Sequence, residues 1–472
     1  MISIYNTATK NKEPFIPIVP QKVGIYVCGL TAYDNCHIGH ARLFIWFDIL
    51  VRYLRELGYQ VTYVRNITDV DDKIINRAKI AGTSYKAIAD KYIKSMHQDE
   101  LLLKNIPPTF EPRVSDNIPE IIEMIKVLIA KKFAYLASNQ DVYYDTTKFS
   151  TYGNFANQTI DTLQPANDTE QQAKLHPTDF VLWKAAKPEE PAWSSPWGPG
   201  RPGWHIECSA MAKKYLGNTF DLHGGGNDLK FPHHQNEIAQ SKAANDCNLA
   251  NYWMHLGFVN NQKEKMSKSL NNFFTIKETL TIFPPEALRY LVLTSHYRSP
   301  MEFSKVALVQ AEIALSKLYL TIKGLNFKKL TLESKLKSSH FYKNFHQAMR
   351  DDFNTPKALA CLFELAHSIN QAKISAGNSE VLKQAGLLKH LCNLIGLLQE
   401  EPMDFLQYGV DQQLITKLIA KRDSFRKNRD WANADQIRNQ LSSMGITIED
   451  QPQQTNWFLE NRNSYLLTIN KL

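Results

Sequence analysis

The chain has 472 residues, of which 43% are hydrophobic and 22% are charged, and its formal net charge is +8. This composition is close to that of soluble globular proteins and excludes an intrinsically disordered chain, and no apolar run reaches the about 20 residues that a bilayer span needs. At roughly 150 residues per domain, the length predicts about three domains. The six cysteines are widely scattered, and residues 1–6 lack the start of a signal peptide. We therefore expect a cytoplasmic protein whose thiols serve in metal binding or catalysis.

The first predicted elements form a βαβ unit. Residues 23–29 are a β-branched and aromatic run, which predicts a buried strand. The apolar segment 43–57 predicts a helix that ends at Gly58, and residues 60–66 predict a second strand. The fold class expected is therefore α/β, with a Rossmann-type parallel sheet.

The texture of the sequence changes further along the chain. Residues 107–202 are rich in Pro, Asn, Gln and Thr and predict an insertion, after which strand patterns return at 219–223 and 253–259. Leucines recur at helical spacing from 305 to about 399, and a basic helix followed by an extended segment is predicted from about 411. We expect a catalytic domain at 1–304, a helical bundle at 305–400 and a small C-terminal domain at 401–472.

Two short motifs point to phosphate chemistry. A His-Ile-Gly-His tetrad at 37–40 stands where the first strand turns into the helix, and a helix N-terminus and imidazoles both attract phosphate. A Lys-Met-Ser-Lys-Ser segment at 265–269 lies in a polar stretch that predicts a loop. Taken singly, a capped helix with surface histidines explains the first motif equally well, and a solvated basic loop explains the second motif better. In this order around a βαβ unit, however, they resemble the class I aminoacyl-tRNA synthetases.

That resemblance implies roles in ATP binding and catalysis. His37, His40, Lys265 and Lys268 would stabilise charge on the phosphates. Gly39 would let the nucleotide approach the backbone, the glycines after His223 would leave room for adenosine, and Asp228 would accept hydrogen bonds from the ribose. The ATP-binding set is then His37, Gly39, His40, Gly226, Asp228 and Lys268.

Four side chains of metal-binding type are scattered along the chain. His233 and Glu237 are four residues apart in a segment that predicts a helix with Pro232 at its first position, so they share a face. Thiolates from elsewhere in the fold could complete a zinc site. His205 and His234 compete for the imidazole position, and a lone Cys or His is more often a structural residue.

Several further motifs resemble the cysteinyl-tRNA synthetase family, and the resemblance covers nearly the whole chain. The matching segments are Thr31 with 33–34 and Cys36, then 203–211, 223–237, 350–356 and 430–438. The family implies one Zn²⁺ held by Cys28, Cys208, His233 and Glu237, a cysteine pocket of Gly29, Thr31, Thr68 and Trp204, and Mg²⁺ with ATP. The partners implied are L-cysteine, ATP and tRNA(Cys), with the protein expected to be a monomer.

The basic helical region predicted in the C-terminal tail contains several Lys and Arg residues together with Trp431. Such a set suits an RNA loop, although a solvated basic helix with Trp431 in its core is an equal alternative. By resemblance this is the anticodon-binding region, with Arg426, Trp431, Asp435 and Asp450 as candidates. Gln454 stands where the family often has glycine, which leaves the turn there open.

The expected reaction has two steps, formation of cysteinyl-adenylate and transfer to the tRNA's terminal ribose. A related cysteine ligase of mycothiol synthesis shares the zinc and ATP motifs but lacks the tail. A zinc-stabilised RNA-binding protein without catalysis is the alternative from another class. No editing domain is expected if a metal excludes serine at first binding.

Overall fold

The computed structural model describes residues 1–156, 171–261, 264–265, 274–326, 334–375, 378–451 and 455–469. They form two compact units, the first built of 1–101, 105–258 and 297–299 and the second of 102–104, 259–296 and 300–472. Among the described helices, none has the length and apolar character that a membrane crossing requires.

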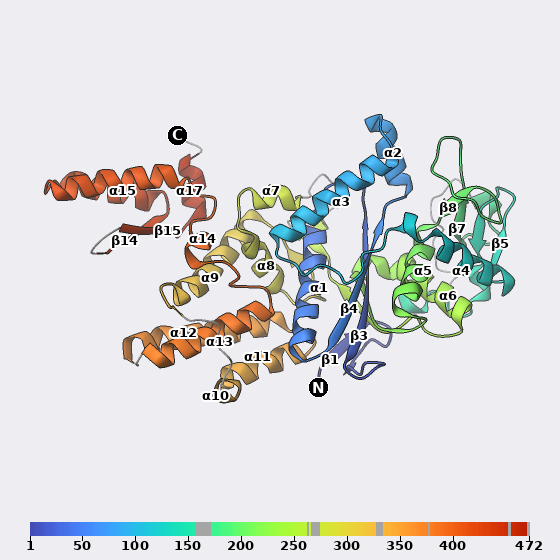
Figure 1. Ribbon diagram of the computed structural model, residues 1–472, viewed down its shortest axis with the longest axis horizontal. Helices are drawn as coiled ribbons and strands as arrows, with labels where there is room; N and C mark the ends of the chain where they lie inside the picture. The colour runs from blue at the N-terminus through green and yellow to red at the C-terminus, as the bar shows by residue number, and fades with distance from the viewer. Residues whose placement is uncertain are drawn as a thin grey trace. The chain divides into compact units, whose positions relative to one another are not determined.

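A four-stranded parallel sheet is the centre of the first unit. Its strands are β3 (Lys22–Thr31), β4 (Gln60–Thr68), β9 (Phe220–Gly226) and β10 (Ala250–Leu256), and their order is β10-β9-β3-β4. Helix α1 (Ile38–Glu56) connects β3 to β4 (Figure 1). This confirms the βαβ unit and the α/β class predicted from the sequence.

Helix α1 packs closely on the sheet because a glycine on β9 leaves space for one of its side chains. A Cβ atom at Gly224 of β9 would lie 2.1 Å from Cζ of Phe47, which is fully buried on α1. This glycine therefore leaves room for Phe47, not for a ligand as the sequence suggested. The helix begins at an N-cap, His37, directly beyond the carboxyl end of β3.

The remaining elements of the first unit surround this sheet. The chain starts with a hairpin of β1 (Ser3–Asn6) and β2 (Asn11–Pro14). The helices are α2 (Asp72–Ala81), α3 (Tyr85–Leu102), α4 (Ile118–Ala130), α5 (Trp204–Leu216) and α6 (Gln235–Asn245). A separate antiparallel sheet has the order β5 (Ala134–Leu136), β6 (Val142–Tyr144), β7 (Phe180–Ala185) and β8 (Gly200–Pro202). The stretch 107–202, expected to be an insertion, thus contains a helix and a sheet of its own.

A buried arginine fixes the last turns of the first unit. The guanidinium of Arg42 on α1 donates hydrogen bonds to the carbonyl oxygens of Gly257 at 2.8 Å, Phe258 at 2.9 Å, Tyr297 at 3.2 Å and Ser299 at 2.6 Å. Burial lowers the pKa of Arg42 to about 10, so it stays charged at neutral pH. The strand predicted at 253–259 is interrupted at this point, because β10 ends before Gly257.

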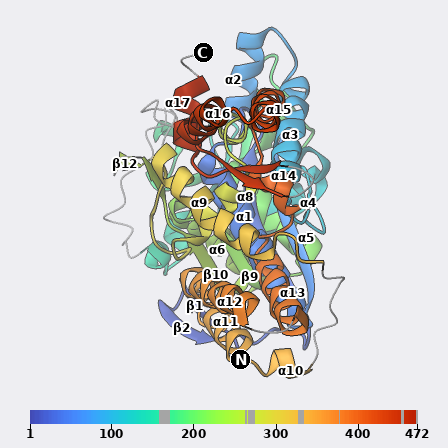
Figure 2. The same cartoon turned by 90° about the vertical axis from the view of Figure 1, so that its left-hand side faces the viewer.

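The second unit is mainly helical. It opens with the short strands β11 (Val259–Asn261), β12 (Glu264–Lys265) and β13 (Met301–Glu302) and the helices α7 (Ile276–Leu280) and α8 (Pro285–Leu293). The predicted bundle consists of α9 (Lys305–Ile322), α10 (Ser334–Lys337), α11 (His340–Arg350), α12 (Thr355–Ser375) and α13 (Asn378–Leu394). Helices α11, α12 and α13 lie side by side (Figure 2). The helical C-terminal region predicted from leucine spacing is therefore confirmed.

The tail has a small core of its own. After α14 (Pro402–Leu406) come α15 (Gln412–Lys427), α16 (Trp431–Ser443), the antiparallel pair β14 (Ile446–Asp450) and β15 (Thr455–Leu459), and α17 (Arg462–Ile469). Apolar side chains such as Ile415, Leu441 and Trp457 pack together between these elements. The predicted basic helix and extended segment are both present.

The packing of α1 on β9 can be tested with Gly224→Ala. The added methyl group collides with the ring of Phe47, and overpacking of this kind costs about 1–3 kcal/mol. We expect a lower Tm by several degrees, and partial recovery when Phe47→Leu is combined with it. Gly24→Ala on β3 is the control, because its Cβ would meet Leu216 at 3.4 Å, an ordinary contact. Equal Tm values for Gly224→Ala and Gly24→Ala would contradict this account.

Candidate metal, nucleotide and RNA sites

The four side chains predicted as metal ligands converge. One ligand atom from each of Cys28, Cys208, His233 and Glu237 lies within 4.8 Å of all the others, and all four residues are buried. The Sγ atom of Cys28 is 3.7 Å from Sγ of Cys208 and 3.3 Å from Oε1 of Glu237. Nε2 of His233 is 3.1 Å from the same Oε1. Two sulfurs, one imidazole and one carboxylate are a donor set that zinc binds readily.

Each donor comes from a different part of the first unit. Cys28 is on β3 near its carboxyl end, Cys208 is in the second turn of α5, and Glu237 is in the first turn of α6. Helix α6 is assigned from Gln235, but the backbone before it is already helical from Pro232, because Phe231 is the residue of the preceding turn that leaves the helical conformation. This break agrees with the helix start predicted at Pro232. Residues 230–234 form one wide turn that contains a cis Phe231–Pro232 peptide. His233 and Glu237 still share a face because the backbone between them is helical.

The two rival histidines are also near this cluster. His205 meets His233 through their Nδ1 atoms, which are 2.9 Å apart, and so lies behind the candidate ligand. His234 turns its Nδ1 to His255 at 2.7 Å, and the described side chains of His234 and His223 form a second possible donor set with Cys28 and Glu237. The first set has two thiols and the second has one.

His223 was missed as a site residue by the sequence reasoning. Its Nε2 lies 2.8 Å from Oε2 of Glu237, the carboxylate oxygen that faces away from Cys28. An imidazole in this position orients a ligating carboxylate. The residue drew attention only through the glycines that follow it, because nothing in the local sequence reveals contact with a helix fourteen residues away.

Burial controls the protonation of the donors. It raises the pKa of both thiols, Cys28 and Cys208. It lowers the pKa of His233 to about 3, so this imidazole is neutral at pH 7 and has a lone pair to offer. Burial alone would raise the pKa of Glu237, but His223 and His233 reverse the effect and lower it. The carboxylate is therefore ionised, whereas the thiols need a cation before they lose their protons.

The predicted cysteine-binding residues lie at the same edge of the sheet. Thr31 and Thr68 are the paired last residues of β3 and β4. The Gly29 N–H donates to Oδ1 of Asn66 at 2.9 Å, and a Cβ atom at Gly29 would lie 1.7 Å from the Asn66 carbonyl oxygen. The half-exposed ring of Trp204 has its centroid 4.4 Å from that of the His233 ring.

A buried carboxyl group next to Cys208 was also missed. The hydroxyl of Thr68 donates to Oε2 of Glu207 at 2.8 Å, and both side chains are inaccessible. Burial raises the pKa of Glu207 well above its usual value. In the sequence Glu207 stands out only as a member of the family-matching segment 203–211.

The His-Ile-Gly-His tetrad caps α1. Nδ1 of His37 accepts from the Gly39 N–H at 3.0 Å, and Nδ1 of His40 accepts from the His37 N–H at 3.2 Å. The two rings stack with centroids 3.9 Å apart. Because each Nδ1 is an acceptor, the proton of the neutral ring is on Nε2. Gly39 is needed here because a Cβ atom would lie 2.8 Å from the His37 ring.

The other predicted nucleotide residues divide into two groups. Gly226 ends β9 and Asp228 follows in a 3₁₀ turn, where a Cβ atom at Gly226 would lie 2.4 Å from Oδ1 of Asp228. Lys265 ends β12. Lys268 lies outside the described residues, as does Gln454 in the tail.

The predicted anticodon residues lie on α15, α16 and β14. Trp431 is 59% exposed, so the alternative that placed it in a core is wrong. Asp435 is exposed one turn further along α16. The Asp450 carboxylate accepts from both Nη atoms of Arg422, at 2.8 and 2.7 Å, and lies 3.1 Å from Nη1 of Arg426. These contacts, led by that with Arg422, lower the pKa of Asp450 to about 2.

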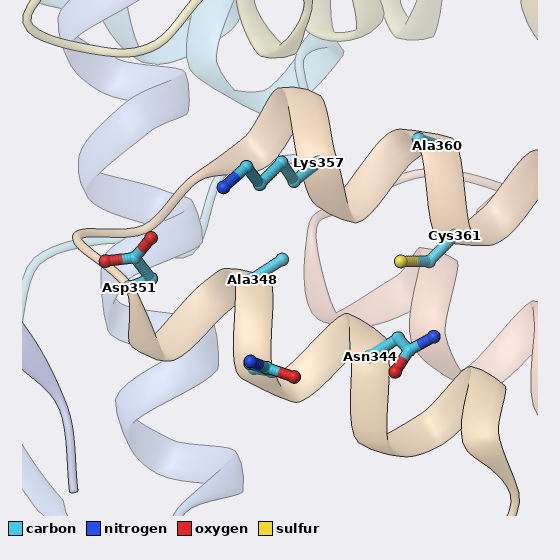
Figure 3. Close-up of a pocket in the computed structure, with 7 residues that line it drawn as sticks. Asn344, Ala348, Asp351, Lys357, Ala360 and Cys361 are labelled. Atoms are coloured by element: carbon cyan, nitrogen blue, oxygen red, sulfur yellow. The ribbon is translucent and has the colours of Figure 1, made fainter.

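A pocket between α11 and α12 contains none of the predicted site residues. Its volume is about 330 Å³, and polar groups of Asn344, Gln347, Asp351 and Lys357 line it together with Cys361 (Figure 3). Asp351 belongs to the segment 350–356 that carried part of the family resemblance. The pocket therefore belongs to the helical bundle and is separate from the predicted site residues.

Comparison with known proteins assigns the family. The profile for the class I (C) catalytic domain of tRNA synthetases matches residues 14–313, that for the DALR domain matches 344–399, and that for the cysteinyl-tRNA ligase anticodon-binding domain matches 413–457. Cysteine–tRNA ligase of Thioalkalivibrio sulfidiphilus is 48% identical over 97% of this chain and 99% of its own length. That of Idiomarina loihiensis is 50% identical over the same shares. The chain belongs to the cysteine–tRNA ligases.

Solved structures share the fold of this chain. The methionyl-tRNA synthetase of Mycobacterium tuberculosis has a TM-score of 0.56 at 14% identity, covering 92% of this chain and 95% of its own. The leucyl-tRNA synthetase of Agrobacterium radiobacter has a TM-score of 0.58 at 11% identity, covering 82% and 87%. At these identities the likeness concerns the fold alone.

The two overlapping donor sets make different predictions for metal content. His233→Asn removes a donor from the first set, and His234→Asn removes one from the second. Both side chains are fully buried, so the two variants are matched in environment. We expect the zinc retained after dialysis, measured by mass spectrometry, to fall from about one per chain to a small fraction in His233→Asn and to persist in His234→Asn. The reverse pattern would select the second set.

Proposed function

We propose that the chain ligates L-cysteine to tRNA(Cys) in two steps, with ATP as the energy source. The observation that carries the proposal is the convergence of two thiols, an imidazole and a carboxylate at the carboxyl edge of the parallel sheet. Ligands of parallel α/β sheets bind at this edge. The anticodon-domain match over 413–457 supports the tRNA as the acceptor, and the rival cysteine ligase of mycothiol synthesis has no such region.

The metal proposed is one Zn²⁺ held by Cys28, Cys208, His233 and Glu237. When bound, zinc accepts a thiolate readily and a hydroxyl poorly, so it supplies the distinction between cysteine and serine. A pocket without it would separate such near-isosteres by only about 1–3 kcal/mol. Four protein donors normally close a zinc site, so the proposal requires room for the substrate sulfur as an additional ligand.

The side chains around the donors hold the rest of the amino acid. Gly29 lets the backbone of β3 lie against β4, which leaves the ends of both strands close together. The hydroxyl groups of Thr31 and Thr68 at these ends would orient the polar part of cysteine. Trp204, packed on His233 and half-exposed, would cover it.

ATP would bind at the turn into α1. Nε2 of His37 and His40, with Lys265 and Lys268, would stabilise charge on the phosphates, and Mg²⁺ would accompany the nucleotide. Gly39, Gly226 and Asp228 would contact the nucleotide. The cysteine carboxylate attacks the α-phosphorus, pyrophosphate leaves, and no side chain forms a covalent intermediate.

The tail would hold the anticodon. Trp431 offers an exposed ring for stacking on a base, and the partly exposed Arg426 near the end of α15 offers a cation. Asp450 would keep Arg422 and Arg426 in place, and Asp435 would contribute from α16. We propose a monomer that works in the cytoplasm, with a catalytic domain at 1–304, a helical bundle at 305–400 and this tail from 401.

Cysteine-dependent exchange of pyrophosphate into ATP tests the proposal. We expect Cys208→Ser to reduce kcat/KM for cysteine at least about 100-fold while KM for ATP changes little, because Cys208 belongs to the proposed zinc site that binds the cysteine thiol. Cys247→Ser is the control, since Cys247 lies outside both donor sets. Equal losses for cysteine and ATP would refute the role of the metal. No cysteine-dependent exchange at all would favour a non-catalytic RNA-binding protein, and exchange without charging of tRNA would favour the mycothiol enzyme.

A further inference from the structure

Three of the exposed cations on the helical hairpin that follows the carboxyl end of β4 lie next to tyrosine side chains. Helix α2 begins at the N-cap Asp71, three residues after the strand, and turns at Gly82 into α3. In Figure 1 these two helices extend beyond the end of β4. Lys73 and Arg77 occupy one face of α2, and Lys91 is on α3. We refer to these three residues as the cationic strip.

Aromatic rings join the strip to the loop that leads into α1. Nζ of Lys73 lies 5.5 Å from the ring centroid of Tyr33, which is in this loop four residues before His37. Nη2 of Arg77 is 3.4 Å from the hydroxyl of Tyr92, and Nζ of Lys91 is 5.2 Å from the centre of the same ring.

A hydrogen bond also ties α3 to that loop. The hydroxyl of Ser95, one turn after Lys91, donates to Oδ1 of Asn35 at 3.1 Å. Asn35 stands two residues before His37. The strip therefore borders the segment that carries the phosphate-binding turn.

The charge of the strip is not neutralised by its own helices. The exposed carboxylate of Asp72 is bound by Arg201 and Lys184, and that of Asp90 by Arg113. Within the described ranges, no strip residue takes part in an ion pair. Asp34, in the loop, is the carboxylate near enough to act on Arg77. A net positive surface with rings among its cations fits a nucleic acid backbone.

We propose that the cationic strip binds the phosphates of the single-stranded 3′ end of the tRNA. The inference rests on the proposed function, in which the terminal ribose must reach cysteinyl-adenylate at the carboxyl edge of the sheet. The nucleotides that precede the terminal one bring their phosphates to the border of this edge, where the strip lies. Lysine and arginine contacts to phosphates fix position without reading sequence.

The test uses Lys73→Ala, Arg77→Ala and Lys91→Ala together in the full chain. The control replaces three other exposed lysines of the first unit, Lys126, Lys213 and Lys242, with alanine. We expect pyrophosphate exchange to be unchanged in both, because it needs no tRNA. We expect kcat/KM for tRNA to fall about 10–100-fold in the strip variant only. A plot of the logarithm of tRNA affinity against the logarithm of salt concentration should also have a slope shallower by about 2, since each phosphate contact to a single strand adds about 0.7 to this slope. Lys73→Arg, Arg77→Lys and Lys91→Arg together should restore most of the activity.

Further measurements distinguish a failure of this inference from a failure of the proposed function. Retention of labelled tRNA on filters measures binding directly and should weaken in the strip variant even if no charging is detected. Strip and control variants that bind and charge tRNA equally, with equal salt slopes, would overturn the inference. A chain without cysteine-dependent exchange would instead overturn the proposed function, and a lowered Tm with unchanged tRNA binding would show that the strip serves stability.

Discussion

The buried carboxylate of Glu237 is the group around which the rest of the site is arranged. The Glu237 side chain is inaccessible to solvent. Burying an ionised carboxylate in such a place costs several kcal/mol of desolvation free energy unless opposite charges and hydrogen bonds surround it. Oε2 meets His223, while Oε1 meets His233 and the thiol of Cys28. Neutral imidazoles and protonated thiols compensate this charge only in part. A divalent cation among the same atoms removes the deficit, which is the physical reason for assigning a metal to this position.

The parallel sheet determines what else surrounds that carboxylate. Carboxyl ends of parallel strands lie at one edge, so β3 brings Cys28 and the turn into α1 to the place where β4 ends in Thr68. His37 follows Cys28 by nine positions, and the chain between them consists of the end of β3 and a short loop. The thiol site and the phosphate-binding turn are thereby neighbours on one strand, as a reaction between an amino acid and ATP requires. The helical hairpin α2–α3 begins at the same edge, which extends this logic to a third substrate.

Local patterns in the sequence were sufficient to predict the helices and strands whose apolar residues recur at regular spacing. Apolar periodicity predicted the βαβ unit and the helical region, because burial against a single core is expressed in spacing along the chain. The four candidate ligands followed from residue type and family motifs. What failed depends on contacts between distant segments. Gly224 suggested space for a ligand, whereas Phe47 occupies it. Trp431 satisfied a core and a surface equally well in sequence, and only its 59% exposure distinguishes them.

The most direct measurement of the central claim is the absorption spectrum of the chain with Co²⁺ in place of zinc. Thiolate ligands give cobalt an intense charge-transfer band, so Cys28 and Cys208 should produce one in the chain alone. The account predicts that L-cysteine strengthens this band, as an added sulfur ligand must, and that L-serine at the same concentration leaves it unchanged. A spectrum that ignores cysteine, or that responds equally to both amino acids, would contradict it.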